Sequence, residues 1–178
     1  MLAGPTAVGK GTICRDLLSR HGNVWLSVSA TTREPRPGEV EGEHYFFVTP
    51  ERFDELVEQG QMLEWAWVHG KHRYGTPRGP VEERLAQGAP VLLEIDLDGA
   101  RQVRKAMPSA RLVFVAPPSR EELIRRLVGR GTEGDEERAR RLATAETELA
   151  AEHEFDTTIV NDDVRSASGH LAELMGIA

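Results

Sequence analysis

The sequence predicts an α/β fold with a parallel sheet at its core. Four short apolar runs contain β-branched residues and are typical of strands buried on both faces, at 24–29, 91–95, 112–116 and 157–160. Helical patterns separate these runs along most of the chain. Because parallel strands need long, usually helical connections, this alternation favours a parallel sheet over an antiparallel one.

Two of the expected helices have distinct start signals. Ser119 followed by Glu122 is a capping box, and an apolar stripe follows over 123–128. Thr49 before Pro50 is typical of an N-cap and the first helical position, and Gly60 marks the end of that helix. We therefore expect helices to begin at these two points.

Two stretches interrupt the alternation and predict insertions on the core. Residues 30–76 contain runs at 44–48 and 62–68 that are typical of strands in a small antiparallel unit around the helix at Pro50. Residues 129–141 are rich in Gly, Glu and Arg. We expect one domain with its core at 1–29, 77–128 and 142–178, and both insertions acting as flaps that exclude water.

Composition excludes several classes of protein. The chain has 178 residues, enough for one sizeable core, and its net charge of −7 disfavours nucleic acid and anionic membranes as partners. It has no long apolar run or leader pattern, and its six histidines lack metal-ligand spacing. A single cysteine, Cys14, fits a cytoplasmic protein, and we expect it to be a small helix residue rather than a reactive thiol.

A glycine-rich loop lies almost at the start of the sequence printed above. The string GPTAVGKGT satisfies the phosphate-loop spacing G-x-x-x-x-G-K, and a helical pattern follows at 13–18. Such a loop turns its backbone N–H groups toward phosphate oxygens, while the lysine adds a charge at the β/γ position. Gly11 replaces the usual hydroxyl residue, and Thr12 supplies the hydroxyl instead. The predicted nucleotide-binding residues are Gly4, Ala7, Val8, Gly9, Lys10, Gly11 and Thr12.

A second loop carries two arginines. In SATTREPRPGEVEGEHYFF, Arg33 and Arg36 can present their guanidinium groups to one phosphate, with the Tyr45 hydroxyl as a further donor. The alternative is a solvated basic loop without a ligand.

These motifs together resemble the guanylate kinase family in its bacterial, actinobacterial form. The resemblance runs through nearly the whole chain in order, in GPTAVGKGT, SATTREPRPGE, EHYFF, LEWAWV, RYGTP, LLEIDLDGA, APPSREEL, GRGT, RRL and IVNDD. It implies a phosphate-loop NTPase fold with a GMP-binding region and a lid. It also implies transfer of a phosphoryl group from ATP to GMP with Mg²⁺.

Glu64 is the candidate that selects guanine. Guanine presents two adjacent donors, N1–H and N2–H₂, which one carboxylate can accept together. Strand alternation places Glu64 on the face opposite Trp65 and Trp67, where it can point toward a pocket. A buried carboxylate there rejects AMP, because its lone pairs would stay unpaired. The alternative is that Glu64 faces water.

The resemblance implies further site residues. Those that match GMP-binding positions are Ser29, Arg33, Arg36, Glu39, Tyr45, Glu64, Tyr74, Thr76 and Glu94. The metal candidates are Asp96, at the end of a strand expected to be buried, and Thr12 of the phosphate loop. A buried acid without a function would be costly at Glu94. Asn161 and Asp162 match a turn near the ATP. The expected catalytic residues are Lys10, Arg36, Arg130 and Arg141, of which the last two are lid arginines. For the neighbouring Arg126, Arg138 and Arg140 we expect a solvated charge run.

Three features depart from the family pattern. Only three residues precede the loop, so we expect either an upstream start or missing residues. Asp98 adds a charge near the expected metal, and Gly134 adds a residue to the lid. Two rival functions remain open at this point: a phosphopeptide-binding module of the same fold, and a kinase for another nucleoside monophosphate. The motifs carry no prediction of oligomeric state.

Overall fold

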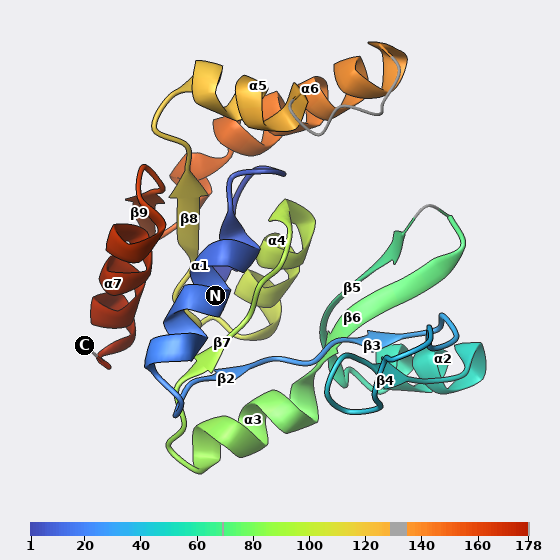
Figure 1. Ribbon diagram of the computed structural model, residues 1–178. Helices are drawn as coiled ribbons and strands as arrows, with labels where there is room; N and C mark the ends of the chain where they lie inside the picture. The colour runs from blue at the N-terminus through green and yellow to red at the C-terminus, as the bar shows by residue number, and fades with distance from the viewer. Residues whose placement is uncertain (69, 129–134, 178) are drawn as a thin grey trace.

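The computed structural model describes residues 1–68, 70–128 and 135–177, and it confirms the α/β prediction. Figure 1 shows a parallel sheet in the middle, a small second sheet on the right and a helical arm at the top. The central strands are β1 (Leu2–Ala3), β2 (Trp25–Leu26), β7 (Val91–Leu92), β8 (Val113–Ala116) and β9 (Thr157–Val160). All four apolar runs contain a strand, although the first two strands are shorter than predicted.

The central strands lie in the order β2-β7-β1-β8-β9. β2 pairs with β7, and β1 and β9 both pair with β8, all in parallel. An isolated parallel bridge between Leu2 and Glu94 joins the two groups, and the Leu2 N–H donates to the Leu93 carbonyl at 2.8 Å. The short β1 is therefore the middle strand, and the loop that follows it lies at the carboxyl edge of the sheet.

Helices cover both faces of this sheet. α1 (Lys10–Arg20), α5 (Arg120–Val128) and α7 (Val164–Met175) bury their apolar residues with Leu2, Leu92 and Val113. α3 (Arg78–Ala86) and α4 (Leu97–Ala106) cover the other face, where Leu93 packs. Because neighbouring strand residues point to opposite faces, Leu92 and Leu93 belong to different clusters, as expected of a strand buried on both sides.

The insertion at 30–76 forms the small sheet. Its strands are β3 (Ala30–Thr31), β4 (Phe46–Phe47), β5 (Met62–Val68) and β6 (His72–Pro77), in the order β4-β3-β6-β5. β6 pairs antiparallel with β3 and β5, but β4 pairs parallel with β3, so the expectation of a purely antiparallel unit is wrong. The connection from β3 to β4 is a long loop rather than a hairpin, which allows both strands to run in the same direction.

The helix caps agree with the sequence signals, with one difference. Thr49 Oγ1 accepts the Arg52 N–H at the start of α2 (Pro50–Glu58), and Ser119 Oγ accepts the Glu122 N–H at 3.1 Å. The Glu122 carboxylate does not complete the capping box but pairs with Arg125 and Arg126. The remaining elements are α6 (Asp135–Ala150) and the 3₁₀ turn η1 (Glu152–Glu154). In the described part of the chain, no helix is long and apolar enough to cross a membrane.

Candidate active site

The phosphate loop connects the central strand β1 to α1. Its backbone adopts left-handed φ angles of 147° at Gly4, 66° at Ala7 and 102° at Gly9. A Cβ at Gly4 would overlap the carbonyl oxygen of Val115 on the neighbouring strand β8, so this position needs a residue without a side chain. The loop thus combines a strained backbone with a helix N-terminus, the arrangement that binds phosphate groups.

Lys10 folds back over the loop. Its ammonium group donates to the carbonyl oxygens of Gly4 at 2.6 Å and Pro5 at 3.2 Å. Burial lowers the pKa of Lys10, and the nearby carboxylates of Glu148 and Glu94 counteract part of that shift. The ammonium group therefore lies beside the phosphate loop, bonded to two neutral carbonyl oxygens that a charged phosphate can replace.

Glu94 follows β7 and faces the first turn of α1. A Cβ at Gly11 would lie 3.4 Å from Glu94 Oε1, so the absence of a side chain at Gly11 leaves space for this carboxylate. Glu94 is exposed, and the expectation of a buried strand acid is therefore wrong, because β7 ends at Leu92 and Glu94 takes part only in an isolated bridge to Leu2. Cys14 is buried, and burial together with the neighbouring Glu94 carboxylate raises the pKa of its thiol to about 12, in agreement with a small helix residue rather than a reactive thiol.

The metal candidates provide oxygen atoms but no complete cage. Asp96 Oδ1 caps α4 by accepting the Gly99 N–H at 2.7 Å, and Thr12 is exposed in the first turn of α1. The described residues contain no group of three His, Cys, Asp or Glu side chains able to hold a metal. This donor set fits Mg²⁺, which commonly binds through one or two protein ligands, water and substrate phosphates. Asp98 points to Arg101 instead, at 3.3 Å.

The arginine loop forms an internal network. Arg33 Nε donates to the Tyr74 hydroxyl at 3.0 Å, and Arg33 Nη2 pairs with Glu39 at 2.8 Å. The guanidinium also lies 5.5 Å from the Tyr45 ring centroid, in cation–π contact. Arg33 is therefore not a solvated loop residue. Its partners fix the guanidinium among three predicted GMP-binding residues.

The other residues of this loop differ in their exposure. Glu39 also accepts the backbone N–H of Arg36 at 2.7 Å, and the Arg33 guanidinium holds the pKa of Glu39 below its usual range. The Arg36 residue is exposed, so its charge is available to a ligand. Ser29 is half-buried before β3, and its carbonyl accepts the Phe46 N–H at 2.9 Å. Glu39 thus supports the two arginines rather than offering a free carboxylate.

Glu64 lies on β5 with its carboxylate toward β6. The Thr76 hydroxyl donates to Glu64 Oε1 at 2.5 Å. Burial raises the pKa of Glu64, and the negative charge of Asp96 adds to this effect. A Cβ at Gly99 would lie 3.2 Å from both Glu64 Oε2 and Asp96 Oδ1, so the glycine leaves room for both carboxylates close to the N-terminus of α4. Glu64 is therefore half-buried between β6 and the N-terminus of α4, and the alternative that it points into open water is wrong.

Gln102 joins the small sheet to the core. Its side-chain amide accepts the Trp65 N–H and donates to the Trp65 carbonyl, both at 3.0 Å. Trp65 itself packs on the opposite face against Phe53, with ring centroids 6.2 Å apart. This double hydrogen bond fixes the strand that carries Glu64 against α4.

A pocket beside the loop matches the place expected for the ATP. Its lining includes Ala7, Gly9, Thr12, Asn161 and Asp162. Asn161 is buried, and its Nδ2 donates to the Val8 carbonyl at 2.8 Å. Asp162 is exposed at the rim of the pocket. The turn after β9 and the phosphate loop therefore form one surface.

Arg126 belongs to this surface, contrary to the expectation of a solvated charge run. Its guanidinium donates to the carbonyls of Val8 at 3.2 Å and Asn161 at 3.3 Å. Glu122 holds Nε of Arg126 at 2.8 Å. The spacing of four residues on α5 places both side chains on one helix face, and the expectation failed because the carbonyl partners are distant in sequence.

Of the two expected lid arginines, the structure describes Arg141 but not Arg130. Arg130 and Gly134 lie outside the described residues, as does the side chain of Arg138. Arg141 is half-buried on α6, and Arg140 is exposed. On the same helix, Glu148 accepts the Thr6 N–H of the phosphate loop at 3.0 Å, a contact that no sequence motif indicated.

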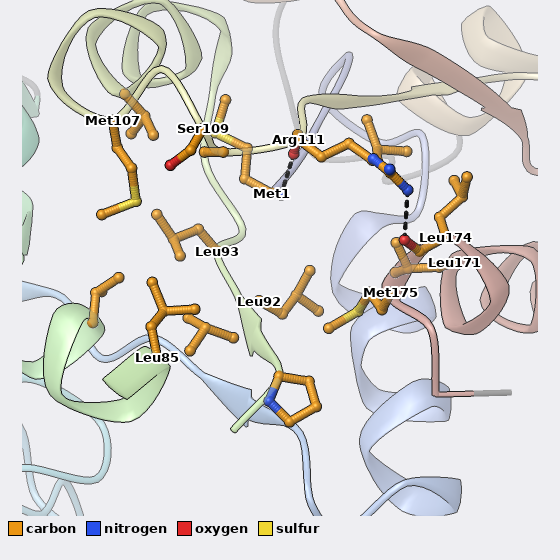
Figure 2. Close-up of a pocket in the computed structure, with 16 residues that line it drawn as sticks. Met1, Leu85, Leu92, Leu93, Met107, Ser109, Arg111, Leu171, Leu174 and Met175 are labelled. Carbon is orange, nitrogen blue, oxygen red and sulfur yellow. Dashed lines mark hydrogen bonds between the residues drawn. The ribbon is translucent and has the colours of Figure 1, made fainter. Parts of the chain in front are cut away.

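Another pocket lies at the opposite edge of the sheet. Figure 2 shows it lined by apolar side chains such as Leu93, Met107 and Leu171, and its volume is about 280 Å³. Met1, directly before β1, and Arg111, two residues before β8, also line it. The amino edge of a parallel sheet is not where phosphate loops bind, and we assign no nucleotide to this pocket.

Comparisons with known proteins agree with this geometry. A family model described as guanylate kinase matches residues 1–177. A guanylate kinase of Streptomyces coelicolor is 59% identical over 177 residues, which cover 99% of this chain and 89% of the relative. One from Streptomyces kasugaensis is 61% identical over 175 residues, covering 98% and 85% of the two chains.

A solved structure gives the same result. The crystal structure of guanylate kinase from Anaplasma phagocytophilum superposes with a TM-score of 0.72 at 33% identity, covering 99% of this chain and 84% of that one. The predicted resemblance is thereby confirmed. The chain belongs to the guanylate kinase family.

Proposed function

We propose that this enzyme transfers the γ-phosphoryl group of ATP to GMP, giving ADP and GDP. The observation that carries the proposal is the joint presence of two sites: a phosphate loop with Lys10, and a facing carboxylate, Glu64, that suits guanine. Family membership supports both substrates. The phosphopeptide-binding alternative is not favoured, because such modules typically lose the phosphate-loop lysine.

On the donor side, the loop amides and Lys10 bind the ATP phosphates, and Asn161, Asp162 and Arg126 shape the neighbouring pocket. Lys10 exchanges its two carbonyl partners for phosphate oxygens, which compensates their charge. In this proposal Thr12 and Asp96 would hold Mg²⁺, which would supply positive charge to the phosphates of the substrate.

On the acceptor side, Arg33, Arg36, Tyr45 and Tyr74 bind the GMP phosphate, with Ser29 nearby. Glu64 accepts N1–H and N2–H₂ of guanine, Thr76 contacts the base, and Glu94 completes the site from the end of β7. Glu39 orients the two arginines. Because the attacking group is already a phosphate anion, positioning and charge compensation suffice, and no general base is needed.

The lid arginines complete the proposal. Arg130 and Arg141 add positive charge to the migrating phosphoryl group when the lid segment closes. We further propose that the enzyme acts in the cytoplasm, in agreement with its single buried cysteine.

The test is ADP formation from ATP and Mg²⁺ with GMP or AMP as the acceptor. We expect turnover with GMP and at least about a hundredfold lower kcat/KM with AMP, because AMP leaves the Glu64 carboxylate unpaired. Equal turnover with AMP would contradict the assignment of Glu64. Binding of GMP without any transfer would contradict the kinase.

A further inference from the structure

Glu148 connects the helical arm to the phosphate loop. It lies in the last turn of α6, and its Oε2 accepts the backbone N–H of Thr6 at 3.0 Å across a separation of 142 residues. The Glu148 residue is only 9% exposed although it carries a carboxylate. A buried carboxylate is costly unless it is hydrogen-bonded and paired, so this contact needs a physical explanation.

The surroundings of Glu148 combine one attraction with two repulsions. Lys10 attracts the carboxylate, whereas Asp96 and Asp98 repel it, and burial raises its pKa. Glu148 in turn provides the strongest carboxylate support to the charge of Lys10. The same carboxylate therefore touches the tip of the loop and lies beside its lysine.

The position of Glu148 on α6 relates it to the expected lid arginine. Arg141 precedes it by seven residues, which is close to two helical turns and a rise of about 10 Å, so both residues project from nearly the same face. A contact that fixes α6 at Glu148 therefore also fixes the direction in which the Arg141 side of the helix points.

We propose that Glu148 is a positioning residue for phosphoryl transfer. Its carboxylate oxygen accepts the Thr6 N–H and thereby holds the tip of the phosphate loop against the C-terminal part of α6. The contact so positions α6, the helix that carries Arg141, relative to the ATP phosphates. This role depends on the reach of the side chain to the amide, whereas the negative charge of Glu148 acts separately, on Lys10. The inference rests on the proposed kinase function.

Two conservative variants separate reach from charge. Glu148→Gln keeps an acceptor oxygen at the same distance and removes the charge, whereas Glu148→Asp keeps the charge and is one methylene, about 1.5 Å, too short to bond the amide. Glu148→Ala removes both. Glu146→Gln and Glu146→Asp are matched controls, because Glu146 is exposed on the same helix and pairs with Arg120.

We expect Glu148→Asp and Glu148→Ala to lower kcat at least about tenfold, because small displacements of catalytic groups cost that much or more. Glu148→Gln should retain kcat within about threefold. The KM for GMP should change less than about twofold in all three, since the acceptor site lies on other elements. Loss of kcat in Glu148→Gln equal to that in Glu148→Asp would overturn the inference, as would full kcat in Glu148→Asp.

A second measurement does not depend on activity. Hydrogen exchange of the Thr6 amide in the unliganded protein should be slow in the wild type and in Glu148→Gln, and at least about tenfold faster in Glu148→Asp. Unchanged exchange in Glu148→Asp would overturn the contact. If the wild type shows no GMP-dependent turnover, the proposed function fails, whereas the exchange experiment still decides whether Glu148 holds the loop.

Discussion

The donor and acceptor sides of the cleft recognise phosphate in different ways. The phosphate loop uses main-chain atoms, with left-handed φ angles at Gly4, Ala7 and Gly9 and one side-chain cation. The acceptor side uses side chains, in a network centred on Arg33 and a separate pair of Glu64 with Thr76. Every residue except proline has a main-chain N–H, so we expect the loop to bind polyphosphates with little selectivity and the side chains to select the acceptor base.

The two sides also differ in what a ligand must displace. Lys10 leaves two neutral carbonyl partners when it binds phosphate. Arg33 is already paired with a carboxylate, and Glu64 with a hydroxyl. The net free energy of a hydrogen bond is the difference between its old and its new partners. We therefore expect a ligand on the acceptor side to gain less binding free energy per contact but to be selected more strictly. Substitutions should therefore affect chemistry on the donor side and substrate choice on the acceptor side.

The largest effect is expected from Lys10→Ala. Removing the only cation of the loop should lower kcat for GMP phosphorylation about a thousandfold, because the charge on the transferred group loses a preorganised partner. Steady-state ADP formation measures it. Lys71→Ala, at an exposed position in the turn between β5 and β6, is the matched control and should retain kcat. If kcat falls less than tenfold in Lys10→Ala, the expectation that substitutions on the donor side mainly affect chemistry is wrong.

A methyl group at Gly4 tests the dependence of the loop on its backbone. Gly4→Ala forces a Cβ against the Val115 carbonyl at φ 147°, and we expect the free energy of unfolding to fall by about 3 kcal/mol. Gly38→Ala, in the acceptor loop, also has a positive φ of 86° but meets no atom within 4 Å, and should cost only about 1 kcal/mol. Urea unfolding of both variants gives the comparison. Equal losses would show that the close approach to β8 is unimportant.

Local patterns explain why much of this molecule could be predicted from its sequence. The run at 157–160 became β9 over the same residues, because short runs with β-branched residues favour strands, but the expectation that it is buried on both faces is wrong: β9 lies at the sheet edge and only Ile159 is buried. Lys10, Arg33 and Glu64 stand in short motifs whose chemistry is recognisable, and in the structure they lie on the phosphate loop, on the loop after β3 and on β5.

Contacts between distant segments could not be predicted in this way. Arg126 reaches the loop carbonyl of Val8 118 residues away, and Glu148 reaches Thr6 142 residues away. On a helix, an Arg or Glu is normally a solvated residue, and only tertiary packing shows otherwise. Gln102 was missed for the same reason, although its position three residues after Gly99 on one face of α4 was a weak signal.

Glu64→Gln should change substrate recognition rather than chemistry on the donor side. The glutamine can accept only one of the two guanine donors and turns its NH₂ toward the other, so we expect the KM for GMP to rise about fiftyfold. The KM for ATP should stay within about twofold. Glu58→Gln, exposed on α2, is the control and should leave both constants unchanged. An equal rise in the KM for ATP would mean that the two sites are not separable.

The smallest effect is expected from Glu39→Gln, which weakens the support of Arg33. The amide still accepts one hydrogen bond but no longer forms an ion pair, so the KM for GMP should rise about threefold with little change in kcat. Glu43→Gln, exposed in the same loop, should have no effect. A change in kcat as large as that in KM would place Glu39 in the chemical step instead of in the support of the acceptor loop.

The pH dependence of thermal stability distinguishes the Arg33–Glu39 ion pair from a pair that is fully solvated. The pKa of Glu39 is lower in the folded protein than its ordinary value of 4.5, because Arg33 and the Arg36 amide stabilise the carboxylate. A depressed pKa stabilises the native state above pH 4.5, and this contribution is lost as the pH falls through the folded pKa. The difference in thermal midpoint between wild type and Glu39→Gln should therefore be constant from about pH 5.5 to 8 and shrink below pH 4.5. A difference that grew on acidification would show that Glu39 binds its proton more tightly when folded, and that the acceptor network is not preformed in the way its hydrogen bonds indicate.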